Sequence, residues 1–103
     1  MQTARVSDYE SASTLFKALA NPVRVAIVHI LAQEERTVGQ LVTELDLTQP
    51  LVSQHLRVLR GANLVATRRQ GQEIWYRICD LHVAHVVGDA ITHTQEESHD
   101  HDR

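Results

Sequence analysis

The chain has 103 residues, of which 43% are hydrophobic and 22% charged, and its formal net charge is −3 at pH 7. This length predicts a single domain, and the lone Cys79 excludes both an internal disulfide framework and a cysteine-rich zinc knuckle. No apolar run approaches the length of a membrane span and the first ten residues lack the apolar stretch of a signal peptide, so we expect a cytoplasmic protein.

The first third of the chain predicts two helices. Residues 8–20 carry apolar side chains at helical spacing. Asn21 is a suitable N-cap for the next helix and Pro22 fits its first turn, because a missing N–H costs little there. We expect this second helix to end at about Gln33.

A short helix, a tight turn and a longer helix follow, and together they predict a helix-turn-helix at about residues 37–61. Thr37 is the expected cap of the short helix, and Asp46-Leu47 forms the turn. The longer helix, from about residue 49, buries an apolar side and presents an amide-rich, cationic face. In a helix-turn-helix, this second helix enters the major groove of DNA.

Two alternating runs, LVATRR and EIWYRI, are joined through Gln70-Gly71-Gln72 and predict a β-hairpin at about residues 64–78. A hairpin after a helix-turn-helix makes the DNA-binding unit winged. Arg68 and Arg69 are expected at its tip, where they suit phosphate or minor-groove contact.

Candidate DNA contacts come from the polar face of the longer helix. Gln49, Ser53 and Gln54 can pair with base edges, and Arg57 can reach guanine or phosphate. His55 falls between this face and the core, so a DNA contact and a structural role both stay open. Residues 47–79 hold five arginines against one glutamate, a net charge of +4 that suits a polyanion.

The C-terminal segment has the opposite character. From residue 80 onward, six carboxylates face one arginine, which gives a net charge of −5, and five of the seven histidines lie there. We expect a helix over about residues 80–97 and a disordered tail over 98–103. An acidic, histidine-rich segment suits a cation.

The spacing of His82 and His93 predicts how a cation would be held. Eleven residues return to nearly the same helix face, but the rise separates the two imidazoles by roughly 16 Å, so one helix cannot close both on one ion. An antiparallel second copy brings His82 opposite His93 of the partner subunit and Asp80 opposite Glu96 of the partner subunit. Two imidazoles and two carboxylates suit tetrahedral Zn²⁺.

Two details complete this metal hypothesis. Asp80 is expected at the N-cap, where its oxygen can aim independently of the helix. Gly88 lies near the implied two-fold axis, where it would let the two backbones approach, although it can also be a tolerated helix defect. A solvated helix surface is the alternative for the whole set. An enzyme is not expected, because a hydrolytic zinc site keeps an open position and these four side chains fill the coordination sphere.

Four segments, KALANPVRVAIVHILA, LTQPLVSQHLRVLRGANLV, RRQGQEIWYRI and DLHVAHVVGDAITHTQEE, together resemble the ArsR/SmtB family of metal-sensing winged-helix repressors over about residues 12–97. The resemblance implies a mainly α winged helix-turn-helix that forms a homodimer through its N- and C-terminal helices and binds double-stranded operator DNA. It also implies that zinc binding lowers operator affinity and derepresses efflux or sequestration genes. In this family pattern, one subunit supplies Asp80 and His82, and the other supplies His93 and Glu96.

The chain also departs from parts of the family. Thr37 and Gly39 stand where thiolate-type members carry a Cys-x-Cys pair, so a soft-metal sensor of that type is not expected. Additional histidines are similar to those of relatives that hold Ni²⁺ or Co²⁺, and these are His85, His99 and His101. A nickel or cobalt sensor, or a winged-helix regulator that senses no metal, therefore remains an alternative.

Overall fold

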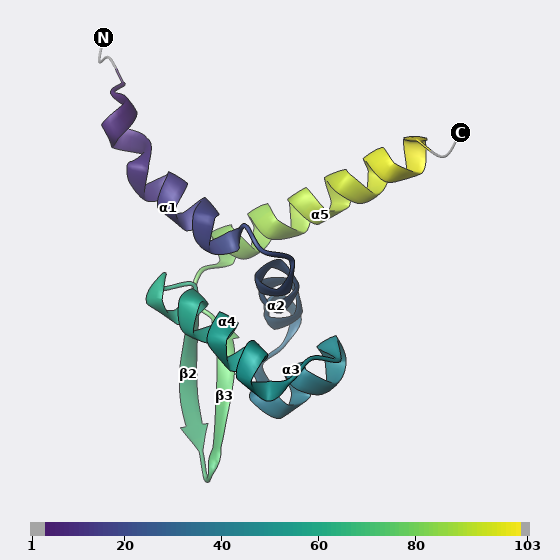
Figure 1. The fold of residues 1–103 in the computed structure, drawn as a ribbon. Coiled ribbons are helices and arrows are strands. Elements are labelled where there is room, and N and C mark those ends of the chain that lie inside the picture. Colours follow the sequence, from purple (N-terminus) through teal and green to yellow (C-terminus); the bar gives the residue numbers. More distant parts are fainter. Residues whose placement is uncertain (1–3, 102–103) are drawn as a thin grey trace.

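The computed structural model describes residues 4–101, with side chains described for residues 4–97 (Figure 1). A short 3-10 turn, Val6–Tyr9, precedes five α-helices and three β-strands in this part of the chain. In chain order the elements are α1 (Glu10–Leu19), α2 (Pro22–Gln33), β1 (Arg36–Thr37), α3 (Val38–Leu45), α4 (Gln49–Gly61), β2 (Val65–Gln70), β3 (Glu73–Ile78) and α5 (Leu81–His101). The predicted fold class, mainly α with a hairpin wing, is confirmed.

Helix starts follow from the capping residues that the sequence predicts. The Asn21 side chain accepts hydrogen bonds from two backbone N–H groups of the first turn of α2, at 2.9 and 3.3 Å, and Pro22 takes the first helical position. Thr37 and Gln40 form a reciprocal capping box at the start of α3. Both predicted caps, Asn21 and Thr37, are confirmed.

The helix-turn-helix consists of α3, a tight turn and α4. Asp46 ends α3 with a φ of 55°, a left-handed conformation that aspartate tolerates better than most residues. Leu41 of α3 and Val52, Leu56 and Leu59 of α4 are almost fully buried. Because α4 packs this apolar side inward, its polar face is left on the outside of the molecule.

The wing is a three-stranded antiparallel sheet with strand order β1-β3-β2. β2 and β3 pair from Val65↔Ile78 to Gln70↔Glu73, and Gly71 occupies the connecting turn with a φ of 63°. β1 pairs with the middle of β3. The sequence does not predict β1, because a two-residue strand is too short to show an alternating pattern.

α2 is the central helix of the core. It buries Ile27 and Val28, and it contacts α1, α4, α5 and β3. α5 packs Val83 and Val87 against this core. Beyond that contact, α1 and α5 run away from the body in different directions, which leaves much of both helices exposed (Figure 1).

The end of α5 differs from the sequence prediction. We expected the helix to stop at about residue 97 and residues 98–103 to be disordered, but the structure continues α5 to His101. Gln95, Glu96 and Glu97 are good helix formers, and no glycine or proline follows to end the helix. Residues 102 and 103 of that predicted tail lie outside the described part.

No single helix within residues 4–101 is long and apolar enough to cross a bilayer. The segments Val6–Leu19 and Pro22–Gln33, which are bent by 94° relative to each other, are together long and apolar enough, by length and composition alone.

Candidate nucleic-acid interface and metal-ligand residues

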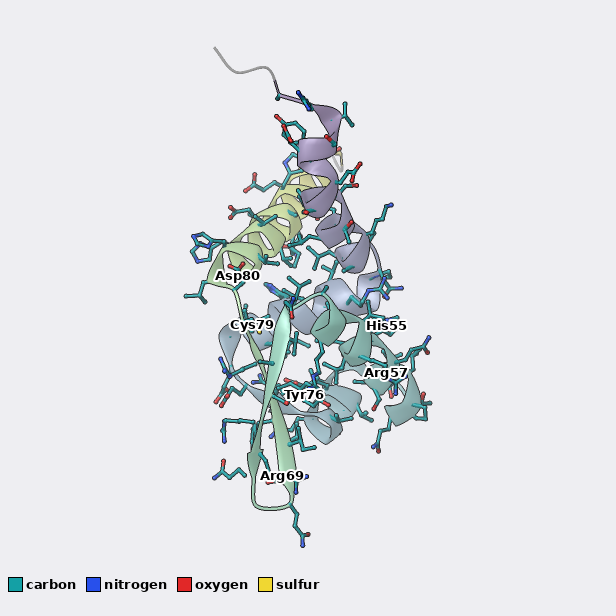
Figure 2. All side chains as sticks on the ribbon, turned by 90° about the vertical axis from the view of Figure 1, so that its left-hand side faces the viewer. His55, Arg57, Arg69, Tyr76, Cys79 and Asp80 are labelled. Carbon is teal, nitrogen blue, oxygen red and sulfur yellow. The ribbon has the colours of Figure 1, made fainter. Side chains whose placement is uncertain are left out.

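The outer face of α4 carries most of the predicted DNA contacts. Gln49, Gln54 and Arg57 are exposed, and Ser53 is half-buried. Arg57 projects from α4 away from the core, and the amide groups of Gln49 and Gln54 are also accessible to solvent (Figure 2). This arrangement can donate and accept hydrogen bonds at base edges or phosphates.

A cationic hollow of about 440 Å³ lies between α4 and the wing. Its lining combines two guanidiniums, a serine hydroxyl and a tyrosine, contributed by Ser53, Arg57, Arg60, Gly61 and Tyr76. Tyr76 comes from β3, and the sequence patterns did not single it out. No carboxylate is among these lining residues, so the hollow suits an anion.

His55 occupies a different position from its neighbours on α4. Its side chain is buried, with 8% of the residue exposed, and its Nδ1 atom lies 3.1 Å from Nη1 of Arg24 on α2. Nε of Arg24 also donates to the carbonyl oxygen of Ala18 at the end of α1, at 2.6 Å. Of the two roles that the sequence left open, burial favours the structural one.

Burial and the nearby guanidinium also affect the charge state of His55. Desolvation lowers the pKa of the His55 imidazole below its ordinary value of 6.5, and the positive charge of Arg24 lowers this pKa further. The neutral ring can accept the hydrogen bond from Arg24 at Nδ1, whereas the protonated ring cannot. His55 therefore joins α2 to the predicted recognition helix in its neutral form.

The two arginines that were predicted together at the wing differ in their surroundings. Arg68 forms an ion pair with Glu35, with Nη2 and Oε2 2.9 Å apart, and its guanidinium lies 5.5 Å from the ring centre of Trp75. The hydrogen bond from Arg68 lowers the pKa of the Glu35 carboxyl. Arg69 is exposed near the hairpin tip (Figure 2). Arg69 thus remains available for DNA, while Arg68 ties the wing to the segment after α2.

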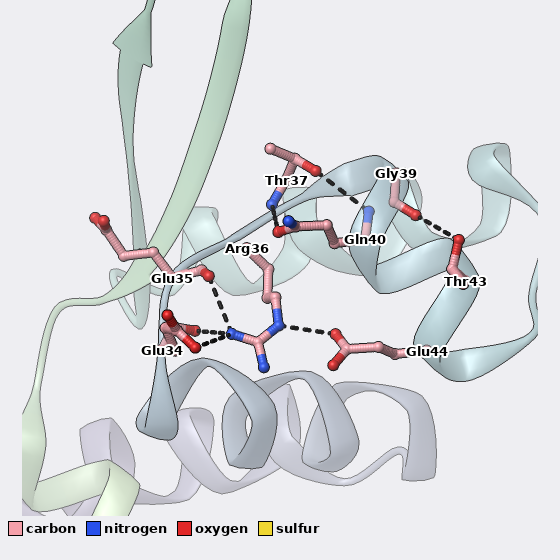
Figure 3. Close-up of polar contacts among 8 residues, drawn as sticks. All are labelled: Glu34, Glu35, Arg36, Thr37, Gly39, Gln40, Thr43 and Glu44. Carbon is pink, nitrogen blue, oxygen red and sulfur yellow. Dashed lines mark hydrogen bonds and ion pairs between the residues drawn. The ribbon is translucent and has the colours of Figure 1, made fainter.

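Further polar contacts fix that segment against α3 (Figure 3). Arg36 donates from Nε to Glu44 at 2.9 Å and from Nη1 to the carbonyl oxygens of Glu34 and Glu35, both at 3.1 Å. Together with the Glu35–Arg68 pair, these bonds connect the wing, β1 and α3. Side-chain contacts therefore join the wing to the helix-turn-helix in addition to the strand pairing of β1 with β3.

Asp80 and His82 are already close together at the start of α5. Asp80 precedes the first helical residue, and its Oδ1 accepts a hydrogen bond from the backbone N–H of His82 at 2.8 Å, as an N-cap does. The same oxygen lies 3.3 Å from Nδ1 of His82. Two ligands placed about 2.0 Å from a tetrahedral zinc ion would lie about 3.3 Å apart, so this pair fits half of a zinc site.

The second predicted pair is arranged differently. Nε2 of His93 lies 3.2 Å from Oε2 of Glu97, one helical turn further on, rather than beside Glu96. This separation also suits two ligands of one tetrahedral ion. Glu97 is therefore a second candidate carboxylate, which the family pattern did not indicate but the i, i+4 spacing could have. Within residues 4–97, no three histidine, cysteine, aspartate or glutamate side chains gather around one point.

Between the two pairs, the surface of α5 is apolar around Val86, and this part of the helix surface is called the apolar strip. Successive helical residues turn by about 100°, so Val86 lies within about 40° of His82 and about 20° of His93 on the helix surface. Val86 is 49% exposed, and Phe16 on α1 is 56% exposed. A groove of about 200 Å³ joins these two helices and is lined by Phe16, Leu19, Ala20, Val25, Val86, Val87 and Ala90.

Gly88 does not lie on this strip. It is about 160° around the helix from Val86, and a Cβ atom built on it would meet nothing within 4 Å. The helix geometry therefore does not support the predicted close approach of two backbones at Gly88.

Comparison with known proteins gives consistent similarities. A family model described as "Bacterial regulatory protein, arsR family" matches residues 21–67. The "HTH-type transcriptional repressor SmtB" of Mycobacterium tuberculosis is 47% identical over 89 residues, which cover 86% of this chain. The match covers 66% of that repressor, so the chain spans slightly less than two thirds of the length of this curated relative.

Two solved structures extend the similarity to the fold. NolR from Sinorhizobium fredii has a TM-score of 0.76 and 38% identity, over 87% of this chain and 93% of that one. The homodimeric winged helix-turn-helix domain Mb0332 from Mycobacterium bovis, described as a possible ArsR-family regulator, has a TM-score of 0.75 and 30% identity. That match covers 99% of this chain and 94% of the mycobacterial domain.

Proposed function

The chain belongs to the ArsR/SmtB family of winged helix-turn-helix transcriptional regulators, and from this membership we propose that it is a dimeric repressor that releases operator DNA when it binds zinc. Members of this family bind DNA and are not enzymes. The observation that carries the metal part is the Asp80–His82 pair, whose 3.3 Å separation matches two ligands of one tetrahedral ion.

The exposed face of α4 is the proposed reading surface. Gln49, Ser53 and Gln54 would contact base edges in the major groove. The exposed Arg57 would contact guanine or phosphate, and the exposed Arg69 would contact phosphate or the minor groove. Arg68 would act indirectly, by holding the wing through Glu35. His55 would support α4 from inside through Arg24.

The apolar groove between α1 and α5 is the proposed dimer surface. Its exposed Phe16 and Val86 have no cover among the described residues, and their burial would favour association with a second copy. Val86 lies on the same side of α5 as His82 and His93. An antiparallel α5 of the partner would therefore cover the apolar strip and meet both ligand pairs at once.

Each zinc site would then be shared between subunits. Asp80 and His82 supply one half, and the partner subunit's His93 supplies the other half together with either Glu96 or Glu97. Zinc bound there would supply a cross-link between the two α5 helices. The donor set contains only nitrogen and oxygen, which suits zinc and also admits Co²⁺ or Ni²⁺.

Such a cross-link would change the angle between the subunits and therefore the distance between the two α4 helices. α5 packs on α2, and α2 packs on α4, so a rotation of α5 is passed to the reading surface by contacts within one core. The two recognition helices must match half-sites about 34 Å apart. By thermodynamic reciprocity, operator DNA must weaken zinc binding by the same factor by which zinc weakens operator binding.

A titration of the metal-free protein on a duplex from its own promoter tests this proposal. Fluorescence anisotropy would be recorded while Zn²⁺, Co²⁺ and Ni²⁺ are added in parallel, and we expect zinc to release the DNA. His82→Ala and His93→Ala should bind the duplex like the parent protein and fail to release it. The proposed site would be contradicted if zinc still released the DNA from both variants. It would also be contradicted if the metal-free variants failed to bind the duplex tightly.

Glu96→Gln and Glu97→Gln form a matched pair for the remaining ligand. Each change removes one charge and keeps the side-chain size, so only the variant that lacks the true ligand should lose zinc affinity. Histidine binds metal only through an unprotonated ring nitrogen, so acidification should also weaken zinc binding by the parent protein. Flat affinity between pH 7 and 5.5 would reject histidine ligation.

A regulator of the same fold that senses no metal is the second candidate. It is favoured by the similarity to NolR, whose relative in Rhizobium meliloti is named only as a nodulation protein. In that case, α5 would serve as a dimer surface alone. The absence of stoichiometric zinc binding by the metal-free dimer would favour this candidate over the first.

A further inference from the structure

Arginines in the central part of the chain differ in whether another group of the protein already pairs with them. Within residues 4–97, Arg24, Arg36 and Arg68 each have protein partners: a histidine and a carbonyl for Arg24, and carboxylates for the other two. Arg57 and Arg60 have neither an ion pair nor a side-chain hydrogen bond with the described residues, and both are exposed. Their charges are therefore free to bind an external anion.

Arg57 and Arg60 line the hollow between α4 and β3. Ser53, Arg57 and Arg60 recur at intervals of four and three residues, so they form one stripe along α4 that faces the wing. Tyr76 closes the hollow from β3. All of these side chains can donate hydrogen bonds, and two guanidinium charges without a carboxylate among the lining residues favour a negatively charged ligand.

Tyr76 has a ring that packs against the core and a hydroxyl that is still accessible. The ring contacts the buried cluster, and the residue is half-buried. Its hydroxyl makes no hydrogen bond with the described residues, and it is not among the buried polar atoms that lack a partner, so solvent reaches it. The phenol is thus held rigidly and keeps one unused donor.

The position of the hollow indicates which anion it takes. In the proposed complex, α4 enters the major groove and the wing lies over the neighbouring minor groove, so a sugar–phosphate backbone, which separates the two grooves, would pass between them. We propose that the hollow seats one phosphodiester of the operator, with Arg57 and Arg60 as charged donors and Tyr76 as a neutral donor. This seat rests on the proposed DNA-binding function, and it assigns Arg57 to phosphate rather than to guanine.

Salt dependence of DNA binding separates the charged donors from the neutral one. With metal-free protein, anisotropy would be measured on the promoter duplex and on a random duplex of equal length over a series of salt concentrations. A lost phosphate contact reduces the log–log salt slope by about 0.9, so Arg60→Gln should reduce the slope of the dimer by about 1.8 on both duplexes. Tyr76→Phe should weaken binding roughly fivefold per subunit on both duplexes, with an unchanged slope.

Two matched variants serve as controls. Arg77→Gln removes the same charge from the neighbouring position of β3, whose side chain points to the other face of the sheet, so it should change the slope less than Arg60→Gln. Gln54→Ala should weaken binding mainly on the promoter duplex, because it removes a base contact. Thermal melting would show that Tyr76→Phe, which keeps the packed ring, still folds.

The outcomes distinguish the seat from the function on which it rests. Suppose that the parent protein binds the promoter duplex. If Arg60→Gln then leaves the salt slope unchanged, or weakens binding to the promoter duplex alone, the seat is wrong and the repressor proposal stands. If the parent protein binds neither duplex, both proposals fail. Equal losses on both duplexes, with the expected slopes, support the seat.

Discussion

Acidification should destabilise this protein through His55, and the substitution His55→Gln should remove that effect. Above the ordinary histidine pKa, neutral His55 accepts a hydrogen bond from Arg24 at 3.1 Å. Protonation would place a second positive charge beside the guanidinium and convert the acceptor into a donor. Glutamine is neutral at every pH in this range, so the variant has no group at this position that acidification would protonate.

The sign and size follow from proton linkage. Burial and Arg24 hold the folded-state pKa of His55 below 6.5, so the unfolded chain binds more protons as the pH falls through 6.5. The stability that neutral His55 contributes is therefore fully present above this pH and is lost as the pH falls below it. For one group with an unfolded pKa of about 6.5, the loss between pH 7.5 and 5.5 cannot exceed about 1.4 kcal/mol. A lost hydrogen bond of about 1 kcal/mol falls within that limit.

Urea unfolding of metal-free protein at pH 7.5 and 5.5, at one protein concentration, measures this effect. The parent protein should lose about 1 kcal/mol more unfolding free energy on acidification than His55→Gln, because every other histidine is common to both proteins and cancels in the difference. Identical pH dependence of the two proteins, or a larger loss in the variant, would refute the reasoning.

Three further changes test other parts of the structure. Glu35→Gln should free Arg68 from its ion pair and raise the affinity for random duplex DNA several-fold at low salt, measured by anisotropy; unchanged affinity would mean that Trp75 alone holds Arg68. Leu56→Ala, at a site with 1% exposure, should lower the free energy of urea unfolding by about 2–5 kcal/mol, and a loss below 1 kcal/mol would mean that the core collapses around the change. Val86→Asp should shift the protein toward monomer in sedimentation, and an intact dimer would move the interface away from α5.

Local signals in the sequence predicted most of the elements. Caps such as Asn21 and Thr37 act within three residues of themselves, and the tight turn at Asp46 and the hairpin turn at Gly71 depend on a few neighbouring dihedral angles. The family resemblance rests on the same local segments. For this reason the helix-turn-helix, the wing and the position of Asp80 before α5 could be predicted from the sequence.

Roles that depend on distant partners could not be predicted in the same way. Arg68 and Arg69 are neighbours of identical chemistry, yet only Arg68 meets Glu35, which lies 33 residues earlier in the chain. His55 is buried and lies beside Arg24, which comes 31 residues earlier in the chain. Glu97 rather than Glu96 lies beside His93, which depends on the side-chain arrangement along α5.

By itself, the sequence determined where the helices and the two hairpin strands begin, which faces are polar and that four metal-capable side chains recur in register. These properties are set by short-range dihedral preferences and by periodicity. Only the tertiary structure decided which arginines of the described part are paired with other groups of the protein. It alone also formed the hollow beside Tyr76. Charge pairing and burial depend on how α2, α4 and β3 pack together, and no local pattern contains that information.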